Sequence, residues 1–166
     1  CGMSRRGTRS TSWTRLNRKY AGLTPGVKRG YTSSIAVYVD QSGSVSDSDL
    51  ELAFGELRSL AKRTSFTTFH FDTAVDTDSE TAWRKGKTPD AKRTRCGGTD
   101  FQCVTKHANA NSSRFDGYII ITDGEASKPT PSKLKRGWMI VPGRKLLFDA
   151  DRSDFIISMK NIKAAA

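Results

Sequence analysis

Residues 117–124 read Gly-Tyr-Ile-Ile-Ile-Thr-Asp-Gly and contain the most apolar segment of the 166-residue chain. The three consecutive isoleucines predict a buried strand, because β-branched side chains pack well on a pleated sheet. Asp123 and Gly124 end this apolar run abruptly. A second apolar run, residues 35–39, ends in the same way at Asp40 and is followed by a Ser/Gly cluster. Apolar runs of this kind are typical of strands buried on both faces of a parallel sheet.

The sequence between these two runs carries the pattern of two amphipathic helices. The first is expected to begin at Ser46, with acids in its first turn and bases in its last turn. Its apolar residues recur at helical spacing and are Leu50, Ala53, Phe54, Leu57, Leu60 and Ala61. Asp100 can cap the second helix. One face of that helix is predicted to carry Phe101, Val104, His107 and Ala108.

Further strands are predicted at residues 66–71, 81–84, 138–141 and 155–159. Residues 85–98 are rich in Gly, Pro, Lys and Arg and are expected to form a loop. Because helices rather than tight turns separate the apolar strands, the sequence predicts an α/β fold with a Rossmann-like, doubly wound and mostly parallel sheet that has helices on both faces. In such folds, ligands bind beyond the carboxyl ends of the strands.

Charge is distributed unevenly along the chain, whose formal net charge is +11. Residues 1–30 contain eight Lys or Arg and no acid, so we expect a basic leader or linker there. Residues 31–163 are nearly neutral and are expected to form the domain, with 164–166 as a tail. The leader fits a solvated tail or a segment that docks on an acidic surface. Because Trp13 and Tyr20 lie among its bases, it also fits nucleic-acid binding, although no nucleic-acid motif accompanies it.

Several classes of protein are excluded or disfavoured. No apolar run reaches the ~18 residues that span a bilayer, and no signal peptide is present, so a soluble, cytoplasmic protein without a membrane partner is expected. Cys1, Cys96 and Cys103 are odd in number and lack zinc-finger spacing, which favours reduced thiols in a cytoplasm. Cys1 and Gly2 precede Met3, so we expect the chain to be a fragment of a longer protein.

Polar residues follow the predicted strands at the edge where ligands are expected. Asp40, Ser42 and Ser44 come after the first strand, Asp123 follows the Ile-rich strand, and Thr99 lies in the Gly-Gly-Thr-Asp loop before the second helix. If the two strands are parallel neighbours, Asp40 and Asp123 emerge at the same edge. At an assumed separation of ~5 Å and an effective dielectric of ~20, two carboxylates repel by roughly 3 kcal/mol, so a positive charge is expected between them.

All five side chains offer hard oxygen atoms. This donor set suits Mg²⁺, with Mn²⁺ or Ca²⁺ as alternatives, and is a poor match for zinc, which prefers imidazole and thiolate ligands. Mg²⁺ keeps an octahedral geometry, so a site with few charged ligands leaves a position open to a carboxylate from a partner. The ordinary alternative is that Asp and Ser after a strand serve as turn and cap residues.

The three segments together resemble the metal-ion-dependent adhesion site (MIDAS) of von Willebrand factor type A (VWA) domains. In this resemblance, the five motif positions are occupied by Asp40, Ser42, Ser44, Thr99 and Asp123. Roughly residues 12–160 are similar to the bacterial and phage VWA-like domain that follows a metallopeptidase-like region in longer proteins. The residues outside the site that carry this similarity are Ser12, Trp13, Arg15, Asn17, Arg18, Phe101 and Trp138 to Gly143.

The resemblance implies a Rossmann-like sheet, a Mg²⁺ at its carboxyl edge and a role in protein–protein recognition, often beside MoxR-type AAA+ ATPases. One segment departs from the family pattern. The connection from Glu125 to Lys135 contains Pro129 and Pro131 and is short for the helix expected there. The principal expectation is a Mg²⁺-dependent interaction module without catalytic residues, in which an acidic residue of a partner protein completes the coordination.

Two other functions stay open from the sequence. A metal-dependent hydrolase would need a general base near the ion, for which Asp72, Asp100 and Glu125 are the candidates. These acids also fit as a strand-end carboxylate, a helix cap and a surface acid. His70 and His107 are expected to be structural, because the H-E-x-x-H signature is missing. Nucleic-acid binding through the basic leader would depend steeply on salt concentration.

Overall fold

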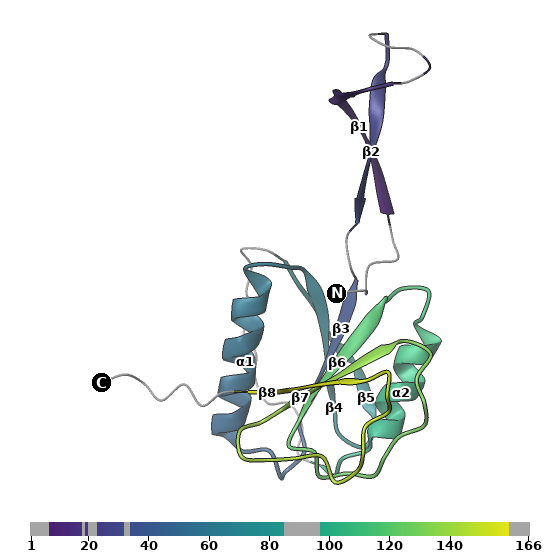
Figure 1. Cartoon of the computed structure of the whole chain (residues 1–166). Helices are drawn as coiled ribbons and strands as arrows, with labels where there is room; N and C mark the ends of the chain where they lie inside the picture. Colours follow the sequence, from purple (N-terminus) through teal and green to yellow (C-terminus); the bar gives the residue numbers. More distant parts are fainter. Residues whose placement is uncertain (1–6, 18, 20–22, 32–33, 85–96, 160–166) are drawn as a thin grey trace, which may run out of the picture.

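The computed structural model describes residues 7–17, 19, 23–31, 34–84 and 97–159, and its body is a six-stranded sheet (Figure 1). The strands lie in the order β5-β4-β3-β6-β7-β8. Their bounds are β3 Ile35–Asp40, β4 Phe66–Phe71, β5 Val75–Trp83, β6 Gly117–Thr122, β7 Lys135–Ile140 and β8 Phe155–Ser158. All neighbouring strands run parallel except β4 and β5. The predicted α/β fold with a mostly parallel sheet is confirmed.

One helix covers each face of the sheet (Figure 1). The side chains of a strand alternate between faces, so Val37 of β3 packs toward α1 (Asp47–Ala61) and Tyr38 packs toward α2 (Phe101–Ala110). The predicted caps are confirmed, because Ser46 accepts a hydrogen bond from Asp49 N and Asp100 accepts one from Gln102 N. Neither described helix is long and apolar enough to cross a membrane.

Strand β5 differs from its prediction in length and direction. It was expected at residues 81–84 and is nine residues long, and it returns antiparallel to β4 after the turn formed by residues 72–74. In this turn, Asp72 Oδ1 accepts a hydrogen bond from Ala74 N at 3.1 Å. The many exposed polar residues of β5 suit an edge strand. Most of the loop predicted at 85–98 lies outside the described residues.

The basic N-terminal segment contains two strands that the sequence did not predict. Strands β1 (Gly7–Leu16) and β2 (Pro25–Tyr31) form a two-stranded antiparallel ribbon, which stands away from the sheet body in Figure 1. Arg9 pairs with Arg29 across the ribbon, and the Trp13 side chain is 70% exposed. The ribbon lacks a run of alternating apolar residues, and this is the signal on which strand prediction depends.

Residues 123–134 and 141–154, which connect β6 to β7 and β7 to β8, contain no helix. The fully buried Arg136 of β7 holds both connections against the sheet. Its Nε donates to Asp154 Oδ2 at 2.8 Å, its Nη2 donates to Asp151 Oδ2 at 2.8 Å, and its Nη1 donates to the carbonyl oxygen of Thr130 at 3.1 Å. Buried polar and ionic contacts therefore fix these connections in the absence of a helix.

Candidate metal site

The register of the two central strands, β3 and β6, brings the two aspartates that are predicted to bind a metal to one edge of the sheet. Val39 of β3 pairs with Ile121 of β6 in a parallel ladder, so Asp40 emerges beside the Thr122–Asp123 segment. The condition under which Asp40 and Asp123 emerge at the same edge, that these two strands are parallel neighbours, is met. Asp40 and Asp123 are each only 1% exposed, so two carboxyl groups lie buried at the carboxyl ends of β3 and β6.

Thr122 is a residue of this site to which the sequence analysis gave no role. Its hydroxyl donates to Asp40 Oδ2 at 2.6 Å and lies 3.4 Å from Asp123 Oδ1. A threonine hydroxyl has one hydrogen to donate, and the shorter contact to Asp40 takes it. The signal that could have identified Thr122 is its position opposite Asp40 when the two strands are aligned in parallel register.

The loop after β3 places both predicted serines together. Ser42 N donates to Asp40 Oδ1 at 2.9 Å, which turns the chain immediately after the strand. The hydroxyl oxygens of Ser42 and Ser44 are 3.1 Å apart. Ser42 is buried and Ser44 is exposed, so the pair extends from the carboxylates toward the surface.

The loop that contains Thr99 is held against the ends of β3 and β4. Gly43 N donates to the carbonyl oxygen of Gly97 at 3.1 Å, and Asp100 N donates to the carbonyl oxygen of Asp72 at 3.0 Å. A Cβ atom at Gly97 would lie 3.0 Å from Asp72 Oδ2, so this close approach favours glycine. Thr99 lies between these two anchored positions, Gly97 and Asp100, and is half-buried.

The charges and hydrogen bonds of the site fit a bound cation. Burial raises the pKa of Asp40 above its ordinary value, and the negative charge of Asp123 adds to this effect, while hydrogen bonds from Thr122 and Ser42 oppose it. Asp123 Oδ1 accepts a hydrogen bond from Glu125 N at 3.2 Å. Its other oxygen, Oδ2, is buried and has no hydrogen-bond partner among the described residues. A buried carboxylate oxygen of this kind is costly unless a cation or donor reaches it.

The chemistry of the donors narrows the choice of cation. Within the described part of the chain, no group of three or more His, Cys, Asp or Glu side chains is arranged to hold a metal. The other side chains that the sequence analysis offers as ligands beside Asp40 and Asp123 carry hydroxyl oxygens, and they are Ser42, Ser44 and Thr99. Such an oxygen-only set fits a hard divalent cation and does not fit zinc.

The remaining candidate residues have structural partners. Asp100 caps α2, and the exposed Glu125 forms an ion pair with Arg144. The hydroxyl of Tyr38 and Nδ1 of His107 are 2.8 Å apart. His70 lies near the ring of Phe54. Both histidines thus belong to packed regions of the protein.

Known proteins resemble this chain in sequence and in fold. An uncharacterized protein of Thermotoga maritima is 29% identical over 128 residues, which are 77% of this chain and 32% of that protein. A crystal structure of an aerotolerance-related membrane protein from Bacteroides fragilis matches this chain with a TM-score of 0.55 and 14% sequence identity. The match covers 78% of this chain and 92% of that chain. The crystal structure of the ArnB paralog VWA2 from Sulfolobus acidocaldarius matches with a TM-score of 0.44 and 19% sequence identity. That match covers 64% of this chain and 34% of that chain.

The chain thus spans about a third of the Thermotoga maritima relative, and the Bacteroides fragilis structure supports the fold alone. Residues 35–146 match the family described as VWA-like domain (DUF2201). The matched range begins at β3 and contains all five predicted ligands as well as Thr122. The chain therefore belongs to the VWA-like domain (DUF2201) family.

Proposed function

We propose that this domain binds one divalent cation, Mg²⁺ in preference to Mn²⁺ or Ca²⁺, and uses it to bind an acidic residue of a partner protein. The observation that carries the proposal is the buried Oδ2 of Asp123, which has no hydrogen-bond partner among the described residues and belongs to the residue directly after β6, the strand next to that of Asp40. A cation at this position would satisfy that oxygen and relieve the repulsion between the two carboxylates.

The number of donors explains how a partner would take part. Asp40, Ser42, Ser44, Thr99 and Asp123 would supply five oxygens, directly or through water, while Mg²⁺ takes about six in an octahedral arrangement. A carboxylate from another protein is the natural occupant of the remaining position. Two acidic ligands leave the ion without an excess of negative charge, which favours binding of a further carboxylate.

The three acids that could act as a general base already have hydrogen-bond or ion-pair partners, which favours partner binding over hydrolysis as the function of the site. Asp100 is engaged as the cap of α2, and Glu125 is paired with Arg144. Asp72 turns Oδ1 toward the backbone of its own turn. A metal-activated water would need a base that is free to accept a proton, so we infer that recognition of a partner is the function of the site.

The wider context is also a proposal. The chain covers about a third of its Thermotoga maritima relative, so the domain is expected to act within a longer protein. We propose that this protein contains a metallopeptidase-like region and that its acidic partner is a MoxR-type AAA+ ATPase. An acidic loop of that ATPase would provide the carboxylate.

The experiment measures cation binding and partner capture separately. Isothermal titration of the chain with Mg²⁺ should show one site, which Asp123→Asn removes and the exposed-site control Asp149→Asn keeps. Capture of a MoxR-type ATPase should require Mg²⁺ and should be reversed by EDTA. Capture that survives both EDTA and Asp123→Asn would refute the mechanism. Turnover of phosphoester substrates that is lost in Asp123→Asn would favour the hydrolase instead.

A further inference from the structure

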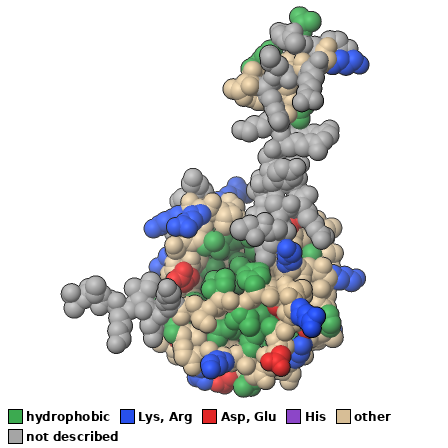
Figure 2. Space-filling model, viewed as in Figure 1, with side chains coloured by type: hydrophobic (Ala, Val, Ile, Leu, Met, Phe, Trp, Pro, Cys, Tyr) green, Lys and Arg blue, Asp and Glu red, His purple; other side chains and the backbone are tan. Residues whose placement is uncertain are grey.

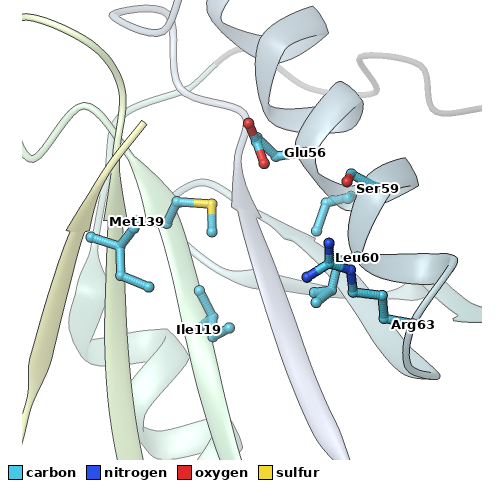
Figure 3. Close-up of a pocket in the computed structure, with 8 residues that line it drawn as sticks. Glu56, Ser59, Leu60, Arg63, Ile119 and Met139 are labelled. Carbon is cyan, nitrogen blue, oxygen red and sulfur yellow. The ribbon is translucent and has the colours of Figure 1, made fainter. Parts of the chain in front are cut away.

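A groove lies between α1 and the face of strands β6, β7 and β8. Its floor consists of Ile119, Met139 and Ile157, and its wall on α1 includes Leu57 and Leu60. We call this feature the α1 groove. Figure 3 shows Ile119 and Met139 on the strand side of the groove, opposite Leu60 on the helix. Its volume is about 300 Å³.

The α1 groove lies where a parallel sheet normally carries a covering layer. The opposite face of the sheet is covered by α2 and by partly buried side chains of the 141–154 connection, among them Leu146 and Phe148. On the α1 side, Met139 is only partly buried, and Ile157 of the edge strand is 45% exposed. Figure 2 shows apolar side chains gathered on one face of the sheet body. The described connections supply no helix to cover this floor.

The shape of the α1 groove favours a helix as its occupant. An extended peptide lying over the floor would place its own backbone N–H and C=O groups against apolar side chains, where they would lack partners. A helix satisfies these groups internally and presents an apolar stripe. Met139 pairs in register with Ile157, so the floor is a continuous surface across β7 and β8 that such a stripe can cover.

The rim of the α1 groove carries two opposite charges. Glu56 lies on α1 and Arg63 lies in the turn directly after this helix, seven residues further along the chain, and both line the groove (Figure 3). Neither side chain forms an ion pair with another described residue. A helix that lies beside α1 would match this rim with an acid near Arg63 and a base near Glu56.

We propose that the α1 groove is a docking site for an amphipathic helix of a partner protein. The partner helix covers Ile119, Met139 and Ile157 with its apolar stripe, and an acid and a base two turns apart pair with Arg63 and Glu56. The α1 groove is distinct from the site of Asp40 and Asp123, so docking there does not require a divalent cation.

The test uses a fluorescent synthetic peptide of about 18 residues with leucines at i, i+3, i+4 and i+7, flanked by one Glu and one Lys about two turns apart. We expect saturable binding to the chain that is unchanged by EDTA. Ile157→Asp should weaken binding about tenfold or more, because a half-exposed floor residue becomes charged. The matched control Leu147→Asp changes a leucine that is 74% exposed outside the groove and should leave binding unchanged. Equal weakening by both variants, or no binding, would overturn the proposal.

Charge reversal tests the orientation of the helix. Arg63→Glu should weaken binding about threefold, and a peptide whose Glu is replaced by Lys should restore it. Absence of this restoration would contradict the pairing.

Sedimentation of the chain alone gives a separate check. A dimer that Ile157→Asp dissociates would show that a second copy occupies the α1 groove and would overturn the assignment to a partner helix.

Discussion

The hydroxyl of Thr122 donates a hydrogen bond to Asp40 Oδ2 at 2.6 Å and so connects the carboxyl ends of β6 and β3. Together with the bond from Ser42 N to Oδ1, this bond fixes the orientation of a buried carboxylate. Because Asp123 directly follows Thr122, the same bond also sets the position of the second carboxyl group relative to the first. Thr122 is thus a positioning residue for the proposed metal site.

Thr122→Val removes this hydroxyl while keeping the shape of the side chain. We expect the free energy of unfolding in EDTA to fall by about 1–3 kcal/mol, since a buried carboxylate loses a charge-assisted hydrogen bond. Urea denaturation measures the change. The same substitution at the exposed Thr77 of β5 should alter stability by less than about 0.5 kcal/mol. Equal stability of Thr122→Val and the wild type would show that the bond is unimportant.

Asp123→Asn should remove the increase in the free energy of unfolding that Mg²⁺ binding produces. The wild-type chain is expected to gain about 2.7 kcal/mol of stability when the Mg²⁺ concentration is one hundred times its dissociation constant. The variant should gain almost nothing, and in EDTA it should be at least as stable as the wild type, because the repulsion with Asp40 is removed. Thermal melts with and without Mg²⁺ test both statements. A normal Mg²⁺ effect in the variant would contradict the proposed ligand role.

The two histidines predict that stability falls at mildly acidic pH. Burial lowers the pKa of both His70 and His107 below the ordinary value of 6.5. The native state therefore binds the proton less tightly than the unfolded state, so this contribution to stability is complete above pH 6.5 and decreases as pH falls through the native pKa. Urea denaturation between about pH 7.5 and pH 5.5 measures the slope.

His107→Gln should make this pH dependence shallower, because the titrating imidazole beside the Tyr38 hydroxyl is removed. His70→Gln should remove the share of the slope that the second histidine contributes. If the double variant retains the full wild-type slope over this range, other groups are responsible for it.

Arg136→Met should destabilise the protein by about 3–5 kcal/mol. The substitution leaves the carboxylate of Asp154, whose side chain is only 2% exposed, without its cation. The indole of Trp138 donates to the same carboxylate at 3.0 Å and cannot replace the charge. The double variant Arg136→Met/Asp154→Leu should recover part of the loss, because no unpaired charge is then buried. A double variant whose loss equals the sum of the single losses would show that the pair is not coupled.

Local patterns predicted most of the elements around the site. The isoleucines of β6 and the apolar run of β3 identified the central strands, and the residues that follow them identified the edge that carries Asp40 and Asp123. Ser46 and Asp100 marked the starts of both helices. These signals are strong because each lies within one short segment of the chain.

Other features depend on pairing between distant segments. The antiparallel return of β5, the ribbon of β1 and β2, and the bond from Thr122 to Asp40 each require a strand register that is invisible to local periodicity. Arg136 looks like an ordinary basic residue in the sequence, and its burial follows from acids supplied by the chain after β7.

The amino-acid chain alone was sufficient to identify the α/β class, the helix caps and the five candidate ligands, because periodicity, capping and strand ends are local properties. The spatial arrangement was needed to recognise the role of Thr122, the unpartnered oxygen of Asp123 and the open α1 groove. These features arise when distant parts of the chain are brought together, such as Asp40 and Thr122, which are 82 positions apart, and burial then fixes the cost of each unpaired charge or uncovered side chain.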